Sequence, residues 1–312
     1  MHKTRRRILS VLSIALALGV AVAAPRIHAA GPTTVNLGTA ASFAILGGTG
    51  VSDTPTSTIT GDVGVSPASG SSITGLTCPE VTGTIYTVDA AGPVCRVVNG
   101  PLMVTAKNDL TAAFIDAAGR TPVTTVPTEL GGTTKTAGVY DSAATTFGIT
   151  AGAGPLVLDG QGDPSSVFIF EMNASGTGLT VGPGSTVSLI NGAQACNVFW
   201  RVDTATINTT AVFKGNILAL TSITVANGAN IEGRLLARNG NVTLISDTIT
   251  RPTCTTTSSG GGSSSSTTPG LPNTGIKPEA HNGYIAVAAA VGGSAALIGG
   301  SSFVLLRKKR AL

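Results

Sequence analysis

Histidine and aromatic residues are scarce in this 312-residue chain. The three histidines, His2, His28 and His281, lie near the two ends, so the central part of the sequence has none. Ser-His-Asp triads, histidine general bases and histidine-ligated metal sites are therefore excluded from that part. Aromatic residues make up 4% of the chain, and Trp200 is the single tryptophan, so a binding site built on aromatic anchors is not expected.

Charged residues make up only 11% of the chain, and the net charge of +4 comes from its two ends. Residues 31–274 carry 9 Lys and Arg against 14 Asp and Glu, a net charge of −5. This segment has no basic stripe to neutralise phosphates, so we expect no nucleic-acid partner. Asp159 and Asp163 flank glycine and proline as turn residues do, and the other acids are scattered singly. We predict that the protein is not an enzyme and holds no cofactor or metal.

The N-terminus has the composition of a signal peptide. Basic residues at positions 3–7 precede an apolar stretch over residues 8–24, and small residues follow. The apolar stretch is short for a membrane span. We therefore predict that residues 1–30 are removed on export, with cleavage near Ala29 or Ala30 and Ala23 as a second option.

The C-terminus contains a second targeting signal. Residues 255–270 form a Gly/Ser/Thr linker, and residues 271–312 hold the motif LPNTG, an apolar run from about Tyr284 to Leu306 and a basic tail. This order resembles the sortase signal of Gram-positive surface proteins. The resemblance implies cleavage between Thr274 and Gly275 and attachment of Thr274 to peptidoglycan, after a stage in the membrane. The alternative is an ordinary single-pass anchor. The motif consists of Leu271, Pro272, Asn273, Thr274 and Gly275.

The cysteines agree with export to an oxidising compartment. The chain has four, Cys78, Cys95, Cys196 and Cys254, and none has C-x-x-C spacing, so two disulfides are favoured over a zinc site. Three pairings are possible. We favour Cys78 with Cys95, which closes a local loop, and Cys196 with Cys254, which ties the last segment of the domain to an earlier one.

Residues 31–254 read as one mainly β domain with a single helix. Short runs rich in Val, Ile and Thr alternate with Gly, Asn and Asp, as in a protein with many short strands. The exception is the segment from Thr105 to Gly119, which has apolar residues at helical spacing. We predict a long helix there, with Thr105 as its N-cap and Gly119 as its stop.

An eighteen-residue repeat indicates which kind of β domain this is. Residues 196–213, 214–231 and 232–249 align without a gap, with Thr206 above Thr224. A fixed period with apolar columns is typical of a solenoid. We predict an irregular right-handed β-solenoid of triangular cross-section with the helix packed alongside, and β-sandwich as the alternative. The expected columns are Phe199, Ile217 and Leu235, and Trp200, Leu218 and Leu236.

One face of these coils should carry a regular set of small polar side chains. Alternation along the strands places Ile207, Ile223 and Val242 inside and hydroxyl or amide residues outside, with a one-residue shift in the last coil. Stacked coils about 4.8 Å apart, with outward residues about 6.7 Å apart along each strand, make a flat grid. The candidate binding residues are Thr204, Thr206, Ser222, Thr224, Asn241 and Thr243.

A rigid, flat and uncharged grid of this kind is suited to an ordered water lattice. Methyl groups hold water in cages, and hydroxyl groups fix that layer by hydrogen bonds. A second candidate surface carries Asn208, Asn227 and Asn230. Two other functions stay open: a wall-anchored adhesin, and a β-helical polysaccharide lyase or hydrolase, for which the isolated Asp203 and Asp247 supply no acid cluster.

Several long blocks resemble the secreted ice-binding (antifreeze) protein family of bacteria, fungi and algae. They are LGTAASFAILGG (37–48), TGDVGVSP (60–67), DAAGRTP (116–122), DGQGDPSSVFIF (159–170), NGAQACNVFW (191–200), GNILALTSIT (215–224) and RLLARNGNVTL (234–244). The resemblance covers about residues 35–250 and implies an irregular β-solenoid with one long helix, and a flat face that adsorbs to ice. The family's loose T-A/G-x-T/N pattern is approached here only by NGAN (227–230) and TSIT (221–224).

Overall fold

The computed structural model describes residues 31–172, 176 and 178–255. These residues belong to one compact unit that contains two core clusters and two disulfides. Residues 31–255 therefore hold the interactions needed to fold by themselves. The predicted signal peptide, linker, LPNTG motif and apolar C-terminal run lie outside the described residues. Within the described part, no helix is long and apolar enough to span a bilayer.

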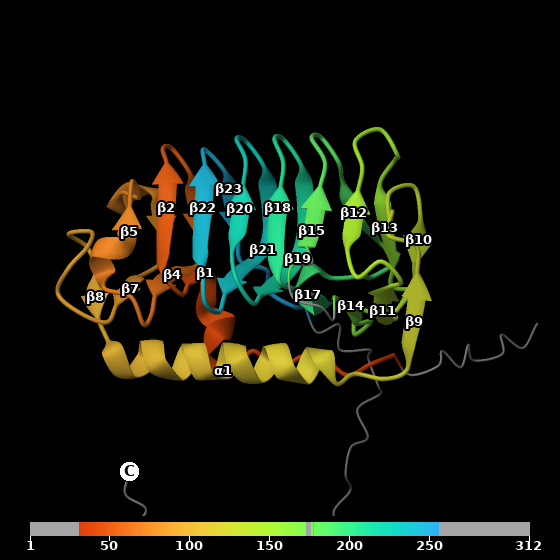
Figure 1. Ribbon diagram of the computed structural model, residues 1–312, viewed down its shortest axis with the longest axis horizontal. Helices are drawn as coiled ribbons and strands as arrows, with labels where there is room; N and C mark the ends of the chain where they lie inside the picture. The colour runs from red at the N-terminus through yellow and green to blue at the C-terminus, as the bar shows by residue number, and fades with distance from the viewer. Residues whose placement is uncertain (1–30, 173–175, 177, 256–312) are drawn as a thin grey trace, which may run out of the picture. The chain divides into compact units, whose positions relative to one another are not determined.

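Parallel strands form three sides around one core, as expected for a β-solenoid (Figure 1). The first side is packed against the helix α1 (Gly100–Ala118). Its strands, in spatial order, are β8 (Val97–Val98), β7 (Ile85–Thr87), β4 (Asp62–Val65), β1 (Phe43–Gly47), β21 (Asn230–Ala237), β19 (Val212–Ala219), β17 (Val198–Val202), β14 (Phe168–Glu171), β11 (Gly138–Ser142) and β9 (Val123–Val126).

The second side is a separate seven-stranded sheet. Figure 1 shows its strands side by side as a row of upright arrows above α1. Its strands, in spatial order, are β12 (Phe147–Ile149), β15 (Gly178–Val181), β18 (Thr204–Ile207), β20 (Ile223–Val225), β22 (Asn241–Ile245), β2 (Gly50–Thr54) and β5 (Ile73–Thr74).

The third side is built in two parts that meet at the long strands β19 and β21. One part is β10 (Thr134–Lys135), β13 (Leu156–Asp159) and β16 (Val187–Ile190), linked to β19 through the bridge between Thr186 and Val212. The other part is β23 (Thr248–Thr250), β3 (Thr58–Thr60) and β6 (Val81–Thr82), which continues from β21. Short 3-10 turns at 38–42, 70–72, 78–80 and 195–197 lie between strands.

The order of coils in space differs from their order in the chain. β1 lies between β4 and β21, so the first coils of the chain stack on the last one. Figure 1 shows α1 running along the length of the solenoid and connecting the N-terminal coils to the far end, from which the later coils stack back. The fold expected from the sequence is confirmed, including its irregularity. In the seven-stranded sheet the break in chain order lies between β22 and β2, which are neighbours in the sheet although they are far apart in the sequence.

The helix begins earlier than predicted. Its N-cap is Asn99, whose side chain accepts a hydrogen bond from the Leu102 amide at 3.1 Å, and Pro101 occupies the first turn, where no backbone N–H is needed. Thr105 is inside the helix, and its hydroxyl donates to the Pro101 carbonyl. The prediction that Thr105 is the N-cap was wrong, because a hydroxyl side chain inside a helix can donate its hydrogen bond to the backbone carbonyl four residues earlier. Gly119 caps the C-terminus, as predicted.

The predicted apolar columns are shifted by one residue in one coil. Trp200, not Phe199, pairs with Ile217, which in turn pairs with Leu235. The reason is a shorter corner: two residues separate Val202 from Ala205, whereas three separate the matching Ala219 and Ile223. Phe199 instead lies in the cluster beneath α1. The one-residue shift expected in the last coil is confirmed, since Thr224 pairs with Thr243.

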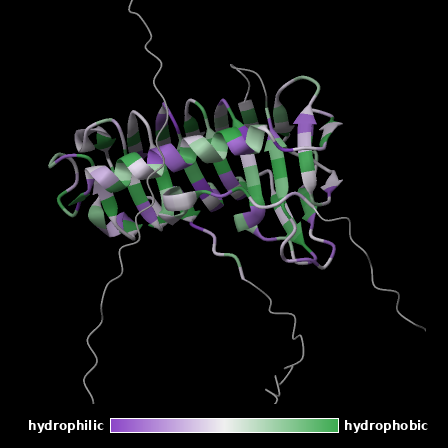
Figure 2. Cartoon of the chain, turned by 90° about the horizontal axis from the view of Figure 1, so that it is seen from below, coloured by the Kyte–Doolittle hydropathy of each residue, from purple (hydrophilic) through white to green (hydrophobic). Residues whose placement is uncertain are grey.

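The core consists of two clusters separated by the helix-covered sheet. The inner cluster fills the solenoid and includes a run of aromatic rings in which Phe170 stacks on Trp200 at 4.1 Å between ring centres. The second lies between that sheet and α1, with Leu110 and Phe114 among its members. Figure 2, seen from the helix side, shows hydrophobic residues recurring from strand to strand. Burial of this repeated apolar surface holds the coils in register.

Both disulfides have the pairing favoured from the sequence. Cys78 pairs with Cys95 across 17 residues, and Cys196 pairs with Cys254 across 58 residues. The first closes the excursion before α1, and the second ties the C-terminal segment to the 3-10 turn before β17. The second disulfide therefore links the C-terminal end of the described domain covalently to an earlier coil.

Candidate functional site

A continuous row of hydroxyl side chains crosses the seven-stranded sheet. The strand register pairs each member of the row directly with the next, over six neighbouring strands. The row runs through Thr180, Thr206, Thr224, Thr243, Ser52 and Thr74 in spatial order. Four of these side chains are exposed, and Thr243 and Ser52 are half-buried. We call this set the hydroxyl row.

The remaining sequence candidates lie next to the hydroxyl row on the same sheet. Thr204 precedes Thr206 by two positions on β18 and pairs with Gly178, and Asn241 precedes Thr243 on β22 and pairs with Gly50. Ser222 lies immediately before β20, where its carbonyl accepts from the Ala205 amide at 3.0 Å. The structure therefore brings all six predicted residues to one side of the solenoid, and α1 does not cover that side.

Asn241 fixes the orientation of part of the row. Its side-chain amide donates to the Ser52 hydroxyl at 2.8 Å and to the Thr243 hydroxyl at 2.9 Å. Both oxygens are thereby held in place before any ligand arrives. This contact also joins an N-terminal strand, β2, to a C-terminal strand, β22.

The sheet is kept flat and rigid from inside. The residues that alternate with the row, among them Ala205, Ile223 and Val242, are 2% exposed or less and pack in the inner cluster. Each strand is hydrogen-bonded to a parallel neighbour on both sides except at the two ends. Because side chains on one strand face are about 6.7 Å apart and the strands about 4.8 Å, the exposed groups form a fixed two-dimensional lattice.

Sequence reasoning missed three members of the hydroxyl row: Ser52, Thr74 and Thr180. Ser52 and Thr74 belong to coils at the start of the chain, and their position beside β22 follows from the interrupted stacking order. Thr180 lies one coil before the aligned repeat, in a segment whose spacing is less regular. Only the period at residues 196–249 was visible in the sequence.

The second candidate surface is a corner of the solenoid. Asn208 follows β18, and its amide donates to the Val181 carbonyl at 2.8 Å, so it serves to hold neighbouring coils. Asn227 lies in the turn before β21, and its carbonyl accepts from the Thr210 amide. Asn230 is the first residue of β21. These side chains do not share one strand face, unlike the hydroxyl row.

The charged groups near this sheet are buried or lie at its corners. Asp53 is on β2 but points inward, where it accepts from the Ser57 hydroxyl at 2.7 Å, and burial raises the pKa of its carboxyl. Asp203 is at a corner and accepts from the Thr221 hydroxyl and the Gly176 amide. Asp247, the other isolated acid, accepts from two backbone amides, of Ala229 and Ile245. These carboxylates organise turns.

Two buried carboxyl groups, those of Glu171 and Asp247, make the stability of the domain depend on pH. Burial raises the pKa of Glu171 to about 7, an effect that Arg201 opposes and Asp141 strengthens, and burial raises the pKa of Asp247 to about 6. Their unperturbed values are 4.5 and 3.8. Between the unfolded and folded pKa values the folded state binds more protons, so its stability decreases as pH rises through this window.

We therefore expect the free energy of unfolding to fall by on the order of 2 kcal/mol between pH 5 and pH 7.5. Urea titrations across that range would measure it. Glu171→Gln should remove much of the slope, whereas Glu232→Gln, a change in a partly exposed salt bridge with Lys214, should leave it unchanged. Equal slopes in wild-type protein and Glu171→Gln would contradict this assignment. Burial raises the pKa of Glu80, but its hydrogen bonds with Thr77 and Ser57 outweigh that effect and lower the pKa. Glu80 therefore affects the free energy of unfolding only at lower pH.

Within the described residues, no group of three or more His, Cys, Asp or Glu side chains could hold a metal ion. A parallel β-solenoid with one flat, hydroxyl-bearing side defines a surface-binding protein, in which a repeated lattice takes the place of a pocket.

The comparisons agree on one family. Residues 45–250 match the ice-binding-like family. The chain is 40% identical over 222 residues to an ice-binding protein of Flavobacterium frigoris (strain PS1), covering 70% of this chain and 76% of that protein. It is 39% identical over 254 residues to an ice-binding protein of Nostoc sp. (strain HG1), covering 80% and 84%.

Solved structures give the same result. A domain of ice-binding protein 1 from Shewanella frigidimarina superposes with a TM-score of 0.64 at 33% identity, covering 72% of this chain and all of that domain. An ice-binding protein from an Antarctic biological consortium gives a TM-score of 0.63 at 37% identity, covering 72% and 95%. The chain belongs to the ice-binding-like family.

Proposed function

We propose that this protein binds ice through the hydroxyl row and its neighbours on the seven-stranded sheet. The single observation that carries the proposal is the unbroken register of Ser and Thr residues across six adjacent strands. No charged residue belongs to the row. Its relatives named above are ice-binding proteins, which supports the same role here.

The threonine side chain suits this task because it has two different ends. Its methyl group holds water in a cage without binding it, and its hydroxyl anchors that water by a hydrogen bond. Repetition at fixed spacing extends the ordered layer over the sheet, and the layer can then join the lattice of ice. Because the sheet is already rigid, little conformational entropy is lost on adsorption. The protein thus acts by binding, without catalysis.

Adsorption has a direct effect on crystal growth. Ice must advance between bound molecules, and the curved front that results has a higher free energy than a flat one. The freezing point therefore falls below the melting point, and small crystals recrystallise more slowly. Measurements of thermal hysteresis and recrystallisation with residues 31–255 test the proposal. Ice growth identical to that in buffer would favour the adhesin alternative.

We further propose that the protein is displayed on the wall of a Gram-positive-type bacterium. The support is the order of LPNTG, apolar run and basic tail at residues 271–312, together with the leader at residues 1–30. Sortase would join Thr274 to peptidoglycan, and the linker at 255–270 would separate the domain from the wall. A cell or its envelope would then be held at an ice surface.

Wall attachment should depend on the sorting threonine. Thr274→Ala should move nearly all of the protein from the peptidoglycan fraction of a sortase-positive host to the membrane and medium. Thr268→Ala, a matched change in the linker, should leave it in the wall fraction. Wall-linked Thr274→Ala protein at wild-type level would overturn the sortase assignment, and would leave ice binding by residues 31–255 unaffected.

A further inference from the structure

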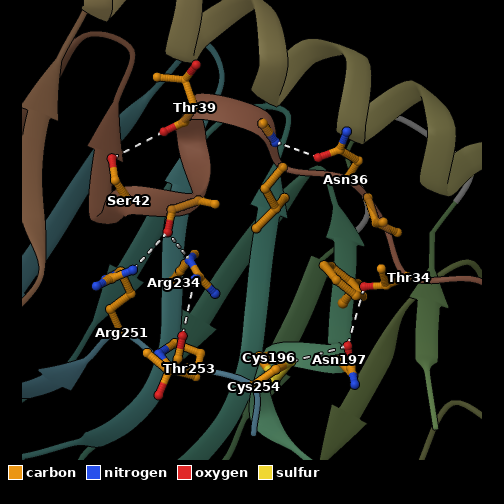
Figure 3. A pocket seen from close by; sticks show the side chains of 16 residues that line it. Thr34, Asn36, Thr39, Ser42, Cys196, Asn197, Arg234, Arg251, Thr253 and Cys254 are labelled. Carbon is orange, nitrogen blue, oxygen red and sulfur yellow. Dashed lines mark hydrogen bonds between the residues drawn. A yellow bond between two sulfur atoms is a disulfide. The ribbon is translucent and has the colours of Figure 1, made fainter. Parts of the chain in front are cut away.

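A second feature of the domain, remote from the hydroxyl row, is a surface pocket of about 740 Å³. It lies where the N-terminal segment 34–42 and the C-terminal segment 251–254 meet β17 and β21 (Figure 3). The Cys196–Cys254 disulfide forms part of its wall. The ice-binding proposal makes no use of this pocket.

Two arginines line the pocket side by side. Arg234 Nε donates to the Ala41 carbonyl at 2.9 Å, and Arg251 Nη1 approaches the same oxygen at 3.5 Å. Figure 3 shows both guanidinium groups on one side of the pocket, near Ser42. Arg234 is 6% exposed, so one of the two positive charges is almost completely removed from water.

Neither arginine has a carboxylate to balance it. The ion pairs of Arg120 with Asp116 and of Lys214 with Glu232 do not involve these arginines, and the described residues that line the pocket include no Asp or Glu. Burial lowers the pKa of Arg234 to about 10, and the neighbouring positive charge of Arg251 adds to the effect. Two adjacent cations in a partly desolvated place cost free energy unless an anion joins them.

A purely structural role accounts for Arg234 but not for Arg251. Arg234 also donates to Asn216 Oδ1 at 2.7 Å and to the Pro252 carbonyl at 3.2 Å, and so it ties both terminal segments to β19 and β21. Arg251 donates only a long hydrogen bond to the Ala41 carbonyl, and that oxygen already accepts a shorter one from Arg234. Arg251 is half-buried and lines the pocket together with Thr39 and Ser42.

We propose that this pocket binds a phosphate group, with Arg251 as its main ligand and Arg234 as a fixed neighbouring charge. The planar guanidinium forks match phosphate oxygens in a bidentate manner, and an anion would relieve the repulsion between the two side chains. The phosphate can be free or part of an ester. Inorganic phosphate and glycerol 3-phosphate distinguish these two sources.

Nuclear magnetic resonance provides the test. Residues 31–255 would be titrated with each phosphate compound at constant ionic strength, with chloride as the balancing anion, and the arginine Nε–Hε signals followed. We expect saturable shifts at Arg251 and Arg234 and at the Thr39 and Ser42 amides. A tighter response to glycerol 3-phosphate would identify an ester as the ligand, and a tighter response to inorganic phosphate would identify the free ion.

Arg251→Gln should weaken binding about tenfold or more, because a charged hydrogen-bond donor is lost. In chloride it should keep or raise the melting temperature of the domain, because the repulsion on Arg234 is relieved. Lys135→Gln removes an equal charge on β10 and should bind as wild type does. Non-saturating shifts, or equal binding by wild-type protein and Arg251→Gln, would overturn the proposal. Thr224→Tyr, which tests ice binding, should bind phosphate normally, so the two proposals fail independently.

Discussion

Thr224→Tyr should reduce the thermal hysteresis of residues 31–255 by about tenfold, because Thr224 is near the centre of the hydroxyl row, where a single change has its largest effect. A tyrosine ring there projects beyond the neighbouring threonines and holds them away from the crystal. The same substitution at Thr206 should act similarly, since the two residues are directly paired. The tyrosine ring is exposed in both variants, so the temperature at which the domain unfolds should hardly change.

Thr60→Tyr is the matched control. Thr60 is an exposed threonine at the end of β3, paired with Thr250 and Thr82 on the third side of the solenoid. It has the same chemistry and strand environment as Thr224 but faces another direction. Its variant should keep wild-type hysteresis. Loss of activity in Thr60→Tyr together with full activity in Thr224→Tyr would move the ice-binding surface to the third side.

Trp200→Ala should destabilise the domain by about 3 to 5 kcal/mol. Trp200 is fully buried, stacks on Phe170 and contacts Phe213 at 5.4 Å between ring centres. Its indole N–H donates to the Lys214 carbonyl at 3.1 Å, so the substitution leaves both a cavity and an unpaired carbonyl. Urea unfolding at constant pH measures the change.

Trp200→Phe separates the two contributions. The phenyl ring retains part of the stack with Phe170 but cannot donate to Lys214, and we expect a loss of about 1 to 2 kcal/mol. A cost below about 1 kcal/mol for Trp200→Ala would show that the coils on either side of β17 are not held by this aromatic column. The thermal hysteresis of Trp200→Phe should stay close to that of the wild type, because it is measured far below the temperature at which the domain unfolds.

The fold was largely predictable because its strongest signal is local. The eighteen-residue repeat and the apolar pattern of the helix both lie within short stretches of chain. The two wrong predictions, the column of Phe199 and the start of the helix, concern places where the local structure departs from these patterns. The corner after Val202 is one residue short, which moves Phe199 out of the expected column, and Asn99 starts the helix before the apolar pattern becomes visible.

Half of the hydroxyl row was predictable, and the other half depended on topology. Thr206, Thr224 and Thr243 come from consecutive coils, so alternation and period together placed them on one face. Ser52 joins them only because β2 stacks on β22, from which it is separated by most of the chain. Such long-range contacts leave no period in the sequence.

The most direct test of the central claim is to observe adsorption itself. A fluorescent fusion of residues 31–255 would be mixed with a single growing ice crystal, and the crystal then washed in protein-free solution. The wild-type domain should remain concentrated on the crystal surface, while a Thr206→Tyr, Thr224→Tyr double variant washes away. Retention of the double variant at wild-type level, or exclusion of the wild-type domain from ice, would contradict the claim that this row of hydroxyls binds ice.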